Sequence, residues 1–291
     1  MNPLRSAPLA LGLALIAAVL HAQPAGLTRD IEFGRAGGES LQLDASVPEG
    51  AGPFPVVILV HGGGWNAGDK GGSNHPGDAA DITPWFAPLT AARFTWFSIN
   101  YRLAPAHPWP AGYEDLLTAI RWVKAHAADY KGDPGRIALF GHSAGGHLVC
   151  LAGTRTEADT RVQAVVGFAP VTDLEYELPL RKGVWTAMQK LLGCPDAFTP
   201  EALARLPDLA PINHVKPGLP PFLLIQGDAD RTVTPPESRG FQAKLRAAGV
   251  PCELILVPGA PHRLLSWAQS DPHFMDKVIA WVQATLKAPA R

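Results

Sequence analysis

The sequence predicts an α/β protein built on a mostly parallel sheet, and three observations carry that prediction. Short β-rich runs alternate along the chain with longer stretches in which apolar residues recur at helical spacing. The later runs are almost entirely apolar, as strands covered by helices on both faces must be. The chain has 291 residues, 47% of them hydrophobic and 18% charged, which is typical of a globular protein with a sizeable core.

Eight runs are expected to form the strands of this sheet. In chain order they are IEF, LQLDASV, FPVVILV, FTWFSIN, RIALF, VQAVVGF, PFLLI and CELILV. Amphipathic helices are expected between them, over Tyr113 to Ala128, over Glu237 to Ala248 and over about Pro272 to Lys287. Alternation of this kind favours parallel strands joined by crossover helices.

One long connection interrupts the alternation. About fifty residues separate the run VVGFAPV from the next strand, and they include a helical stretch from Val184 to Leu192. Connections of this length usually carry structure and function of their own. We therefore expect a small cap insertion over about residues 174–216, above the carboxyl edge of the sheet, where open α/β sheets bind ligands.

The first 22 residues are typical of a secretory signal peptide. Arg5 precedes an apolar stretch from Ala7 to Leu20, which is short for a bilayer span and is followed by small residues. Cleavage near Ala22 would leave residues 23–291 as a periplasmic or secreted catalytic domain without a stable membrane span. An uncleaved anchor is the alternative, and a lipid-attached form is not indicated because no cysteine follows the stretch.

Composition excludes several partners. The formal net charge is −1 and no run of lysine or arginine occurs, so neither nucleic acid nor a membrane surface is an expected partner. Three cysteines, Cys150, Cys194 and Cys252, leave at least one thiol unpaired. An exported protein can bridge two of them, but the pair is not predictable, and three buried free thiols are an equal alternative.

No metal or other cofactor is predicted. Asp78 and Asp81 lie in the segment HPGDAADITPW, but they lack the dense oxygen-ligand spacing of a calcium loop, and a helix start is the expected role. Cysteine and histidine residues do not occur at zinc-ligand spacing.

The segment RIALFGHSAGGHL carries the strongest chemical signal in the chain. It is a strand-like run followed by Gly141-His142-Ser143-Ala144-Gly145 and then a helical run. The pattern Gly-x-Ser-x-Gly makes a tight turn that holds the serine in a strained, exposed position at the start of a helix, where developing negative charge is favoured. Ser143 is therefore the candidate nucleophile, with a purely structural turn as the alternative.

A glycine-rich segment, VVILVHGGGWNAGDK, is the second signal. Gly62 to Gly64 follow a buried strand, and their backbone N–H groups are expected to point into a site. An acyl-transfer enzyme needs such donors around the oxyanion of its tetrahedral intermediate. A phosphate-binding loop is the alternative, but the Lys-Ser/Thr ending and the dinucleotide spacing are missing.

Five segments together, HGGGW, NYRLAP, GHSAGG, GDAD and PGAPH in that order, resemble the α/β-hydrolase carboxylesterases. The sequence is most similar to hormone-sensitive-lipase-like esterases and to bacterial enzymes that remove feruloyl or acetyl groups from xylan. The resemblance runs from about Val56 to the C-terminus. It implies an α/β-hydrolase fold, a catalytic triad in the order Ser–Asp–His, and no cofactor. It also implies an oxyanion hole formed by the N–H groups of Gly63, Gly64 and Ala144.

The triad acid is expected in the segment QGDADRTVTP. The family pattern His-Gly-x-x-Asp-x-x-Val-Pro places the acid at Asp230, whereas Asp228 is expected to brace the turn through the N–H groups of its neighbours. The segment departs from the pattern twice, with Gln226 in place of the histidine and with Thr234 inserted before the proline. Neither departure is expected to touch the acid.

The triad base follows from chain order, because only His262 and His273 come after the aspartates. His262 follows a strand in a loop, where a base belongs, and His273 stands at the start of the last helix as an expected surface or capping residue. Three further histidines are given structural roles. His142, in the variable position of the pattern, could shape the pocket, but a structurally neutral role is expected. His147 is expected to pack behind the nucleophile, and His61 to brace the glycine segment.

Three tryptophans are candidates for substrate binding. Trp65 follows the glycines, Trp185 lies in the expected cap and Trp267 comes shortly after His262. Each could line an acyl or sugar pocket, although packing is the commoner role of an aromatic side chain near a site.

The predicted function is a serine carboxylesterase acting through an acyl-enzyme. Short acyl or feruloyl esters on plant polysaccharides or their fragments are the expected substrates. A general short-chain esterase and an arylformamidase-like hydrolase are alternatives, because a fold does not fix its substrate. A peptidase could use the same catalytic residues, but a peptidase of this fold would normally carry a large additional domain. A catalytically inactive binding module is a remote alternative, since such modules usually lose a triad or glycine residue.

Overall fold

A computed structural model describes residues 26–72, 82–180, 185–194, 196 and 198–287 of the chain. The proposed signal peptide, Asp78 and Asp81 lie outside these residues. The eight strands are β1 (Leu27–Ala36), β2 (Glu39–Ser46), β3 (Phe54–Val60), β4 (Thr95–Ile99), β5 (Gly132–His142), β6 (Ala164–Phe168), β7 (Phe222–Gly227) and β8 (Cys252–Val257).

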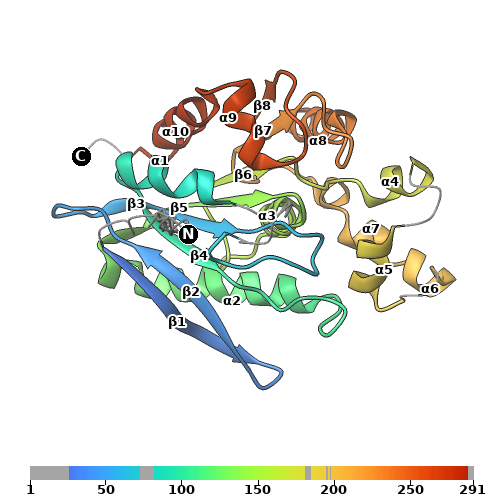
Figure 1. Cartoon of the computed structure of the whole chain (residues 1–291), viewed down its shortest axis with the longest axis horizontal. Helices are drawn as coiled ribbons and strands as arrows, with labels where there is room; N and C mark the ends of the chain where they lie inside the picture. The colour runs from blue at the N-terminus through green and yellow to red at the C-terminus, as the bar shows by residue number, and fades with distance from the viewer. Residues whose placement is uncertain (1–25, 73–81, 181–184, 195, 197, 288–291) are drawn as a thin grey trace, which may run out of the picture.

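These strands form one sheet in the order β1-β2-β4-β3-β5-β6-β7-β8. From β4 to β8 all neighbouring strands are parallel, whereas β1 pairs antiparallel with β2 and β2 pairs antiparallel with β4. The prediction of a mostly parallel eight-stranded sheet is confirmed. The antiparallel hairpin β1–β2 forms one edge, at the lower left of Figure 1.

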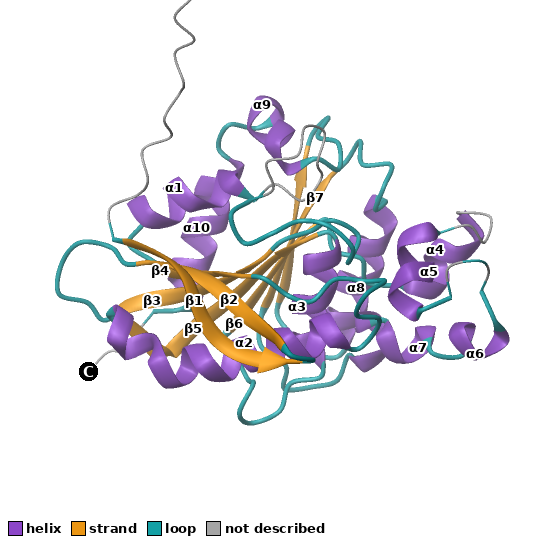
Figure 2. Ribbon diagram, turned by 60° about the horizontal axis from the view of Figure 1, so that its bottom comes forward, coloured by secondary structure: helices purple, strands orange, loops and turns teal. Residues whose placement is uncertain are grey.

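Helices cover both faces of the sheet (Figure 2). The described α-helices are α1 (Phe86–Ala91), α2 (Ala111–His126), α3 (Ala144–Thr154), α4 (Leu174–Leu180), α5 (Thr186–Leu192), α6 (Pro200–Leu203), α7 (Leu206–Leu209), α8 (Pro235–Ala247), α9 (Trp267–Ser270) and α10 (Phe274–Thr285). Short 3-10 turns occur at Thr83–Trp85, Ala127–Tyr130, Pro211–His214 and Leu264–Ser266. The predicted helices therefore form α2, α8, α10 and α5.

Alternating side chains of the central strands build two separate cores. On β3, Val56, Ile58 and Val60 pack in one core with residues of α2, α3 and α8. Val57 and Leu59 point to the other face and pack with residues of α1 and α10. Because successive residues of a strand face opposite sides, an uninterrupted apolar run is what a strand covered on both faces requires.

Between β6 and β7, where the sequence predicts a cap, the chain forms α4, α5, α6 and α7. These helices gather at one end of the molecule, at the right of Figures 1 and 2. Several contacts fix them to the main body: the Trp109 N–H donates to the Leu191 carbonyl at 2.7 Å, His147 of α3 bonds the Leu209 carbonyl at 2.8 Å, and Arg155 pairs with Asp208 at 3.2 Å. The insertion is thus docked on the elements that carry the candidate nucleophile.

Candidate active site

The candidate nucleophile occupies a strained turn between β5 and α3. Ser143 has φ 54° and ψ −117°, in a region that residues other than glycine rarely adopt. Its N–H donates to the Phe168 carbonyl at 2.9 Å, which ties the turn to β6. The residue is the N-cap of α3, so the positive end of the helix dipole faces the serine.

The glycines on either side of Ser143 are required by close packing. A Cβ on Gly141 would lie 2.2 Å from the Gly145 carbonyl oxygen, and one on Gly145 would lie 2.3 Å from the carbonyl oxygens of Val60 and His61. Both distances are far below van der Waals contact, so no other residue fits without movement of the backbone.

Ser143, His262 and Asp230 form a continuous hydrogen-bonded chain. His262 Nε2 lies 2.8 Å from Ser143 Oγ, and His262 Nδ1 lies 2.7 Å from Asp230 Oδ2. All three residues are buried, and Asp230 is only 3% exposed. The expectation of an exposed Ser143 is therefore wrong: the strained turn is found, but the surrounding segments cover the side chain. A neutral imidazole that donates from Nδ1 to the carboxylate leaves Nε2 as the acceptor of the serine hydroxyl. The geometry is that of a serine nucleophile, its base and an orienting acid.

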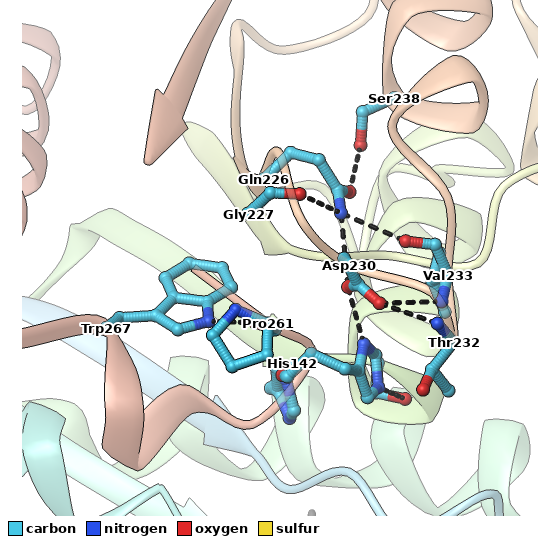
Figure 3. Close-up of polar contacts among 11 residues, drawn as sticks. His142, Gln226, Gly227, Asp230, Thr232, Val233, Ser238, Pro261 and Trp267 are labelled. Carbon is cyan, nitrogen blue, oxygen red and sulfur yellow. Dashed lines mark hydrogen bonds and ion pairs between the residues drawn. The ribbon is translucent and has the colours of Figure 1, made fainter. Parts of the chain in front are cut away.

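Four donors surround the carboxylate of Asp230 (Figure 3). Its Oδ1 accepts the N–H groups of Thr232 at 2.8 Å and Val233 at 3.0 Å, and its Oδ2 accepts from Gln226 Nε2 at 3.2 Å as well as from His262. The expectation that the departure at Gln226 does not touch the acid is therefore wrong. The turn after β7 brings Asp230, four residues further along the chain, within hydrogen-bond distance of the Gln226 amide.

Asp228 braces a neighbouring loop instead of its own turn. The residue is exposed, and its Oδ1 accepts the N–H of Gly259, 31 residues further along the chain, at 2.6 Å. The Asp228 N–H donates to the Val257 carbonyl at 3.1 Å. Asp228 thus joins the loop after β7 to the loop after β8, which carries His262. A bracing role was expected, but the partner is distant in sequence.

Two buried ring side chains, those of His142 and Trp267, contact backbone carbonyls in the loop of His262. His142 Nε2 lies 3.0 Å from the His262 carbonyl oxygen, and Trp267 Nε1 donates to the Pro261 carbonyl at 2.6 Å. His142 and Trp267 are both 0% exposed. The expectation of a neutral role for His142 is wrong, because its ring contacts the triad base. Trp267 is not a substrate platform either, since its indole is covered by Phe168 and Phe274.

The glycine segment runs beside Ser143. A Cβ on Gly62 would lie 3.3 Å from Ser143 Cβ, so the two segments are neighbours. Gly63, Gly64 and Trp65 have φ of 99°, 59° and 60°, a run of left-handed residues that turns the chain sharply after β3. Within the described part of the chain, the N–H groups of Gly63 and Gly64 donate to no backbone or side-chain acceptor. They remain available to a ligand.

The segment NYRLAP supports the glycine segment, a role that sequence analysis did not assign. The Tyr101 hydroxyl donates to the carbonyls of His61 at 3.1 Å and Gly62 at 3.2 Å, and its ring stacks on His61 with centroids 4.4 Å apart. Burial raises the pKa of Tyr101, so the hydroxyl stays protonated and able to donate. His61 also bonds the Gly62 carbonyl at 2.8 Å, as expected of a brace. Arg102 is itself fixed by Asp115, at 2.8 Å.

A chain of aromatic residues connects the glycine segment to the insertion. Trp65 Nε1 donates to His147 Nδ1 at 3.2 Å, and the Trp65 ring lies 5.9 Å from that of Trp185 at the start of α5. His147 is buried behind Ser143 as expected, and burial lowers its pKa to about 4, so the ring is neutral. Trp65 is 3% and Trp185 8% exposed. Their role as pocket walls stays a prediction.

The remaining expectations concern residues outside the site. His273 lies at the N-cap of α10 with an exposed side chain, as predicted. All three cysteines, Cys150, Cys194 and Cys252, are free thiols. Of the two alternatives, a disulfide bond or unpaired thiols, the structure has unpaired thiols, and Cys194 is only partly buried. Among the described residues, no group of His, Cys, Asp and Glu side chains is placed to hold a metal ion. No helix in that part of the chain is both long and apolar enough to cross a membrane.

A strained serine between a parallel strand and a helix, linked to a histidine and an aspartate from the loops after the last two strands, defines an α/β-hydrolase. Within that class, the chain belongs to the BD-FAE family, whose pattern matches residues 43–245. The resemblance predicted from the five sequence segments is confirmed at this level.

The chain is also similar to curated esterases of Mycobacterium tuberculosis. It is 33% identical to the esterase LipC over 239 residues, which cover 76% of this chain and 56% of LipC. It is 32% identical to the carboxylesterase NlhH over 226 residues, which cover 74% of this chain and 68% of NlhH. The chain spans about half the length of LipC and of two further proteins of this organism, between 46% and 56% of each.

Among solved structures, a truncated form of a carbohydrate esterase from gut microbiota has a similar fold. It superposes with a TM-score of 0.73 at 25% sequence identity, covering 89% of this chain and 95% of that one.

Proposed function

We propose that the protein is a serine carboxylesterase that hydrolyses esters through an acyl-enzyme. The observation that carries this proposal is the hydrogen-bonded chain of Ser143, His262 and Asp230, with contacts of 2.8 and 2.7 Å. Membership of the BD-FAE family and similarity to carboxylesterases support it.

In the first half of the reaction, Ser143 Oγ attacks the ester carbonyl while His262 Nε2 takes the hydroxyl proton. Asp230 stabilises the imidazolium that forms and keeps Nδ1 as the donor. His262 then gives the proton to the leaving alcohol, and an acyl-serine remains. In the second half, His262 activates a water molecule, which attacks the acyl-serine and releases the acid.

The oxyanion of each tetrahedral intermediate is stabilised by backbone donors. Gly63 and Gly64 lie in the glycine segment beside Ser143, and Ala144 is the first residue of α3. Loss of a single donor in such a site typically costs about 100- to 1000-fold in turnover. The left-handed run Gly63-Gly64-Trp65 keeps two of these groups out of regular structure and available to the substrate.

For the substrate, we propose short acyl or feruloyl groups carried by plant polysaccharides or their fragments. Similarity to a carbohydrate esterase at 25% identity supports a sugar ester. Trp65 follows Gly64 and packs against Trp185, and a short acyl group fits a pocket walled by these two rings.

Hydrolysis of p-nitrophenyl acetate tests the reaction. The purified protein should turn over this ester and should be labelled by a fluorophosphonate, and Ser143→Ala should abolish both. Failure of both assays with the unaltered protein rejects the esterase and favours an inactive binding module. A panel of acetylated xylan, methyl ferulate, graded p-nitrophenyl esters and N-formylkynurenine then separates the polysaccharide esterase from the general esterase and the arylformamidase.

We also propose that the protein is exported to the periplasm or secreted, on the charge and apolar pattern of residues 1–22. N-terminal sequencing of the protein recovered from an expressing bacterium tests this. A mature start near residue 23 supports cleavage, and an intact Met1 in the membrane fraction supports the anchor.

A further inference from the structure

We infer that Gln226 is a positioning residue that fixes the orientation of the carboxylate of the triad acid. This inference rests on the proposed function. Gln226 is 0% exposed, and its Nε2 lies 3.2 Å from Asp230 Oδ2. That oxygen is the one that accepts from His262 Nδ1 at 2.7 Å. The Gln226 amide therefore bonds the same carboxylate oxygen of Asp230 that orients His262.

The direction of the Gln226 amide is determined by its other partners (Figure 3). Its Oε1 accepts the hydroxyl of Ser238 at 2.9 Å, and its Nε2 also donates to the Val233 carbonyl at 3.0 Å. If the amide were turned over, its oxygen would face a carboxylate oxygen and a carbonyl oxygen, and both are acceptors. The Gly227 carbonyl, 3.3 Å from Nε2, is a third acceptor on the same side, so the observed direction is the one that turns the N–H groups toward Asp230.

The amide also completes the hydrogen bonding of the Asp230 carboxylate. It completes a set of donors in which two backbone N–H groups bind Oδ1 and two side-chain groups bind Oδ2. The neighbouring carboxyls are turned to other partners, Asp228 to the Gly259 N–H and Glu237 to the Thr172 N–H. A histidine at position 226, as in the family pattern, would change charge near neutral pH, whereas an amide does not titrate.

One substitution in two backgrounds tests this role. Gln226→Leu removes the donor and should lower kcat on p-nitrophenyl acetate roughly 10- to 100-fold with KM within about twofold, as expected when a bond to a charged group is lost. In an Asp230→Asn background the same substitution should cause no further loss beyond about twofold, because the group on which Gln226 acts is gone. Rates of fluorophosphonate labelling report on the slow variants.

The pH profile of the Gln226→Glu variant is a measurement that a merely structural role of Gln226 would not change. The substitution keeps the size of the side chain but adds a second carboxyl next to Asp230, and two adjacent carboxyls tend to share a proton. The acid limb of kcat/KM should therefore move to higher pH by at least half a unit. This variant also decides the question if Gln226→Leu does not fold, as judged by circular dichroism.

Gln163→Leu is the matched control. Gln163 also bonds the main chain of the sheet, at Ile137 N and 2.8 Å, but at the opposite ends of the strands from Asp230. Its kcat and pH profile should equal those of the unaltered protein. Two results would overturn the inference and leave the proposed function standing. One is an equal loss of kcat from Gln226→Leu in both backgrounds, and the other is an unchanged kcat and pH profile in the Gln226 variants. Absence of turnover and of labelling in the unaltered protein instead rejects the proposed function.

Discussion

The ring of His142 lies against the ring of His262, with centroids 4.9 Å apart, and His142 Nε2 lies 3.0 Å from the His262 carbonyl oxygen. The residue that precedes the nucleophile in the chain therefore holds the base, 120 residues away. Because Ser143 and His142 belong to the same turn, nucleophile and base are positioned by one rigid segment, and little freedom of the imidazole has to be lost when substrate binds.

Substitution of His142 should lower kcat more than it changes KM. His142→Phe keeps the ring contact and loses the bond to the His262 carbonyl, and we expect a fall in kcat of about tenfold. His142→Ala removes both and leaves a cavity below His262, so its loss should be larger. Steady-state kinetics on p-nitrophenyl acetate measure both. His273→Ala, which changes an exposed histidine on α10, should have no effect. A His142→Phe variant with full kcat would show that the bond is dispensable.

The two aspartates after β7 give opposite predictions. Asp230→Asn keeps the shape of the side chain but favours the wrong imidazole tautomer, so kcat should fall by about 10⁴, as in other triads. Asp228→Asn affects an exposed residue whose bond joins the two loops, and we expect less than a tenfold loss of kcat with a lower thermal midpoint. Steady-state kinetics and thermal denaturation of both variants test which aspartate is the triad acid. The reverse order of activities would assign the acid to Asp228.

Gly145 and Gly240 differ in what surrounds them. A Cβ on Gly145 would lie 2.3 Å from two backbone oxygens, so Gly145→Ala should displace the turn of Ser143 and abolish activity or folding. Gly240 lies within α8, and a Cβ there would meet nothing within 4 Å. Gly240→Ala should raise the free energy of unfolding by up to about 1 kcal/mol through helix propensity, with full activity. Urea denaturation measures this, and an active, stable Gly145→Ala protein would contradict the packing argument.

Much of the fold and the triad could be predicted because both depend on local patterns. The β-rich runs marked all eight strands, although IEF covers only part of β1 (Leu27–Ala36), and the turn around Ser143 carries its own sequence pattern. Chain order then selected His262. The antiparallel hairpin at the edge was not predicted, because strand periodicity does not give direction.

Some of the missed contacts join residues distant in sequence, as His142 and His262 do, whereas Gln226 and Asp230 lie only four residues apart. His142 and Trp267 brace the loop of His262, and Tyr101 holds the glycine segment, but nothing in the local sequence indicates which carbonyl each will bind. Gln226 was noticed only as a departure from a family pattern, although that departure marked a residue that touches the acid. Side-chain length and register, which only the folded chain shows, decide these contacts.

A buried pair of acids between α4 of the insertion and α8 predicts an unusual dependence of stability on pH. Glu237 of α8 and Glu177 of α4 are each 2% exposed, and their carboxyls interact. Burial first, and the Glu177 carboxyl second, raise the pKa of Glu237 well above its usual range. The protonated form of the pair therefore joins α4 to the start of α8, which follows the loop of Asp230.

Because the folded pKa of Glu237 lies above the unfolded one, the folded protein binds more protons between the two values. The contribution of this pair to stability is thus complete below the usual glutamate pKa and is lost as the pH rises through the raised pKa. Glu237→Gln keeps an oxygen for the Thr172 N–H and gives Glu177 a permanent donor. The free energy of unfolding at pH 8 should rise by about 1 to 3 kcal/mol, the cost of an uncompensated buried polar group. Urea denaturation between pH 5 and 9 measures this, with the exposed Glu175→Gln on α4 as control. A variant whose stability falls with pH as steeply as that of the unaltered protein would show that the pair is not the titrating group.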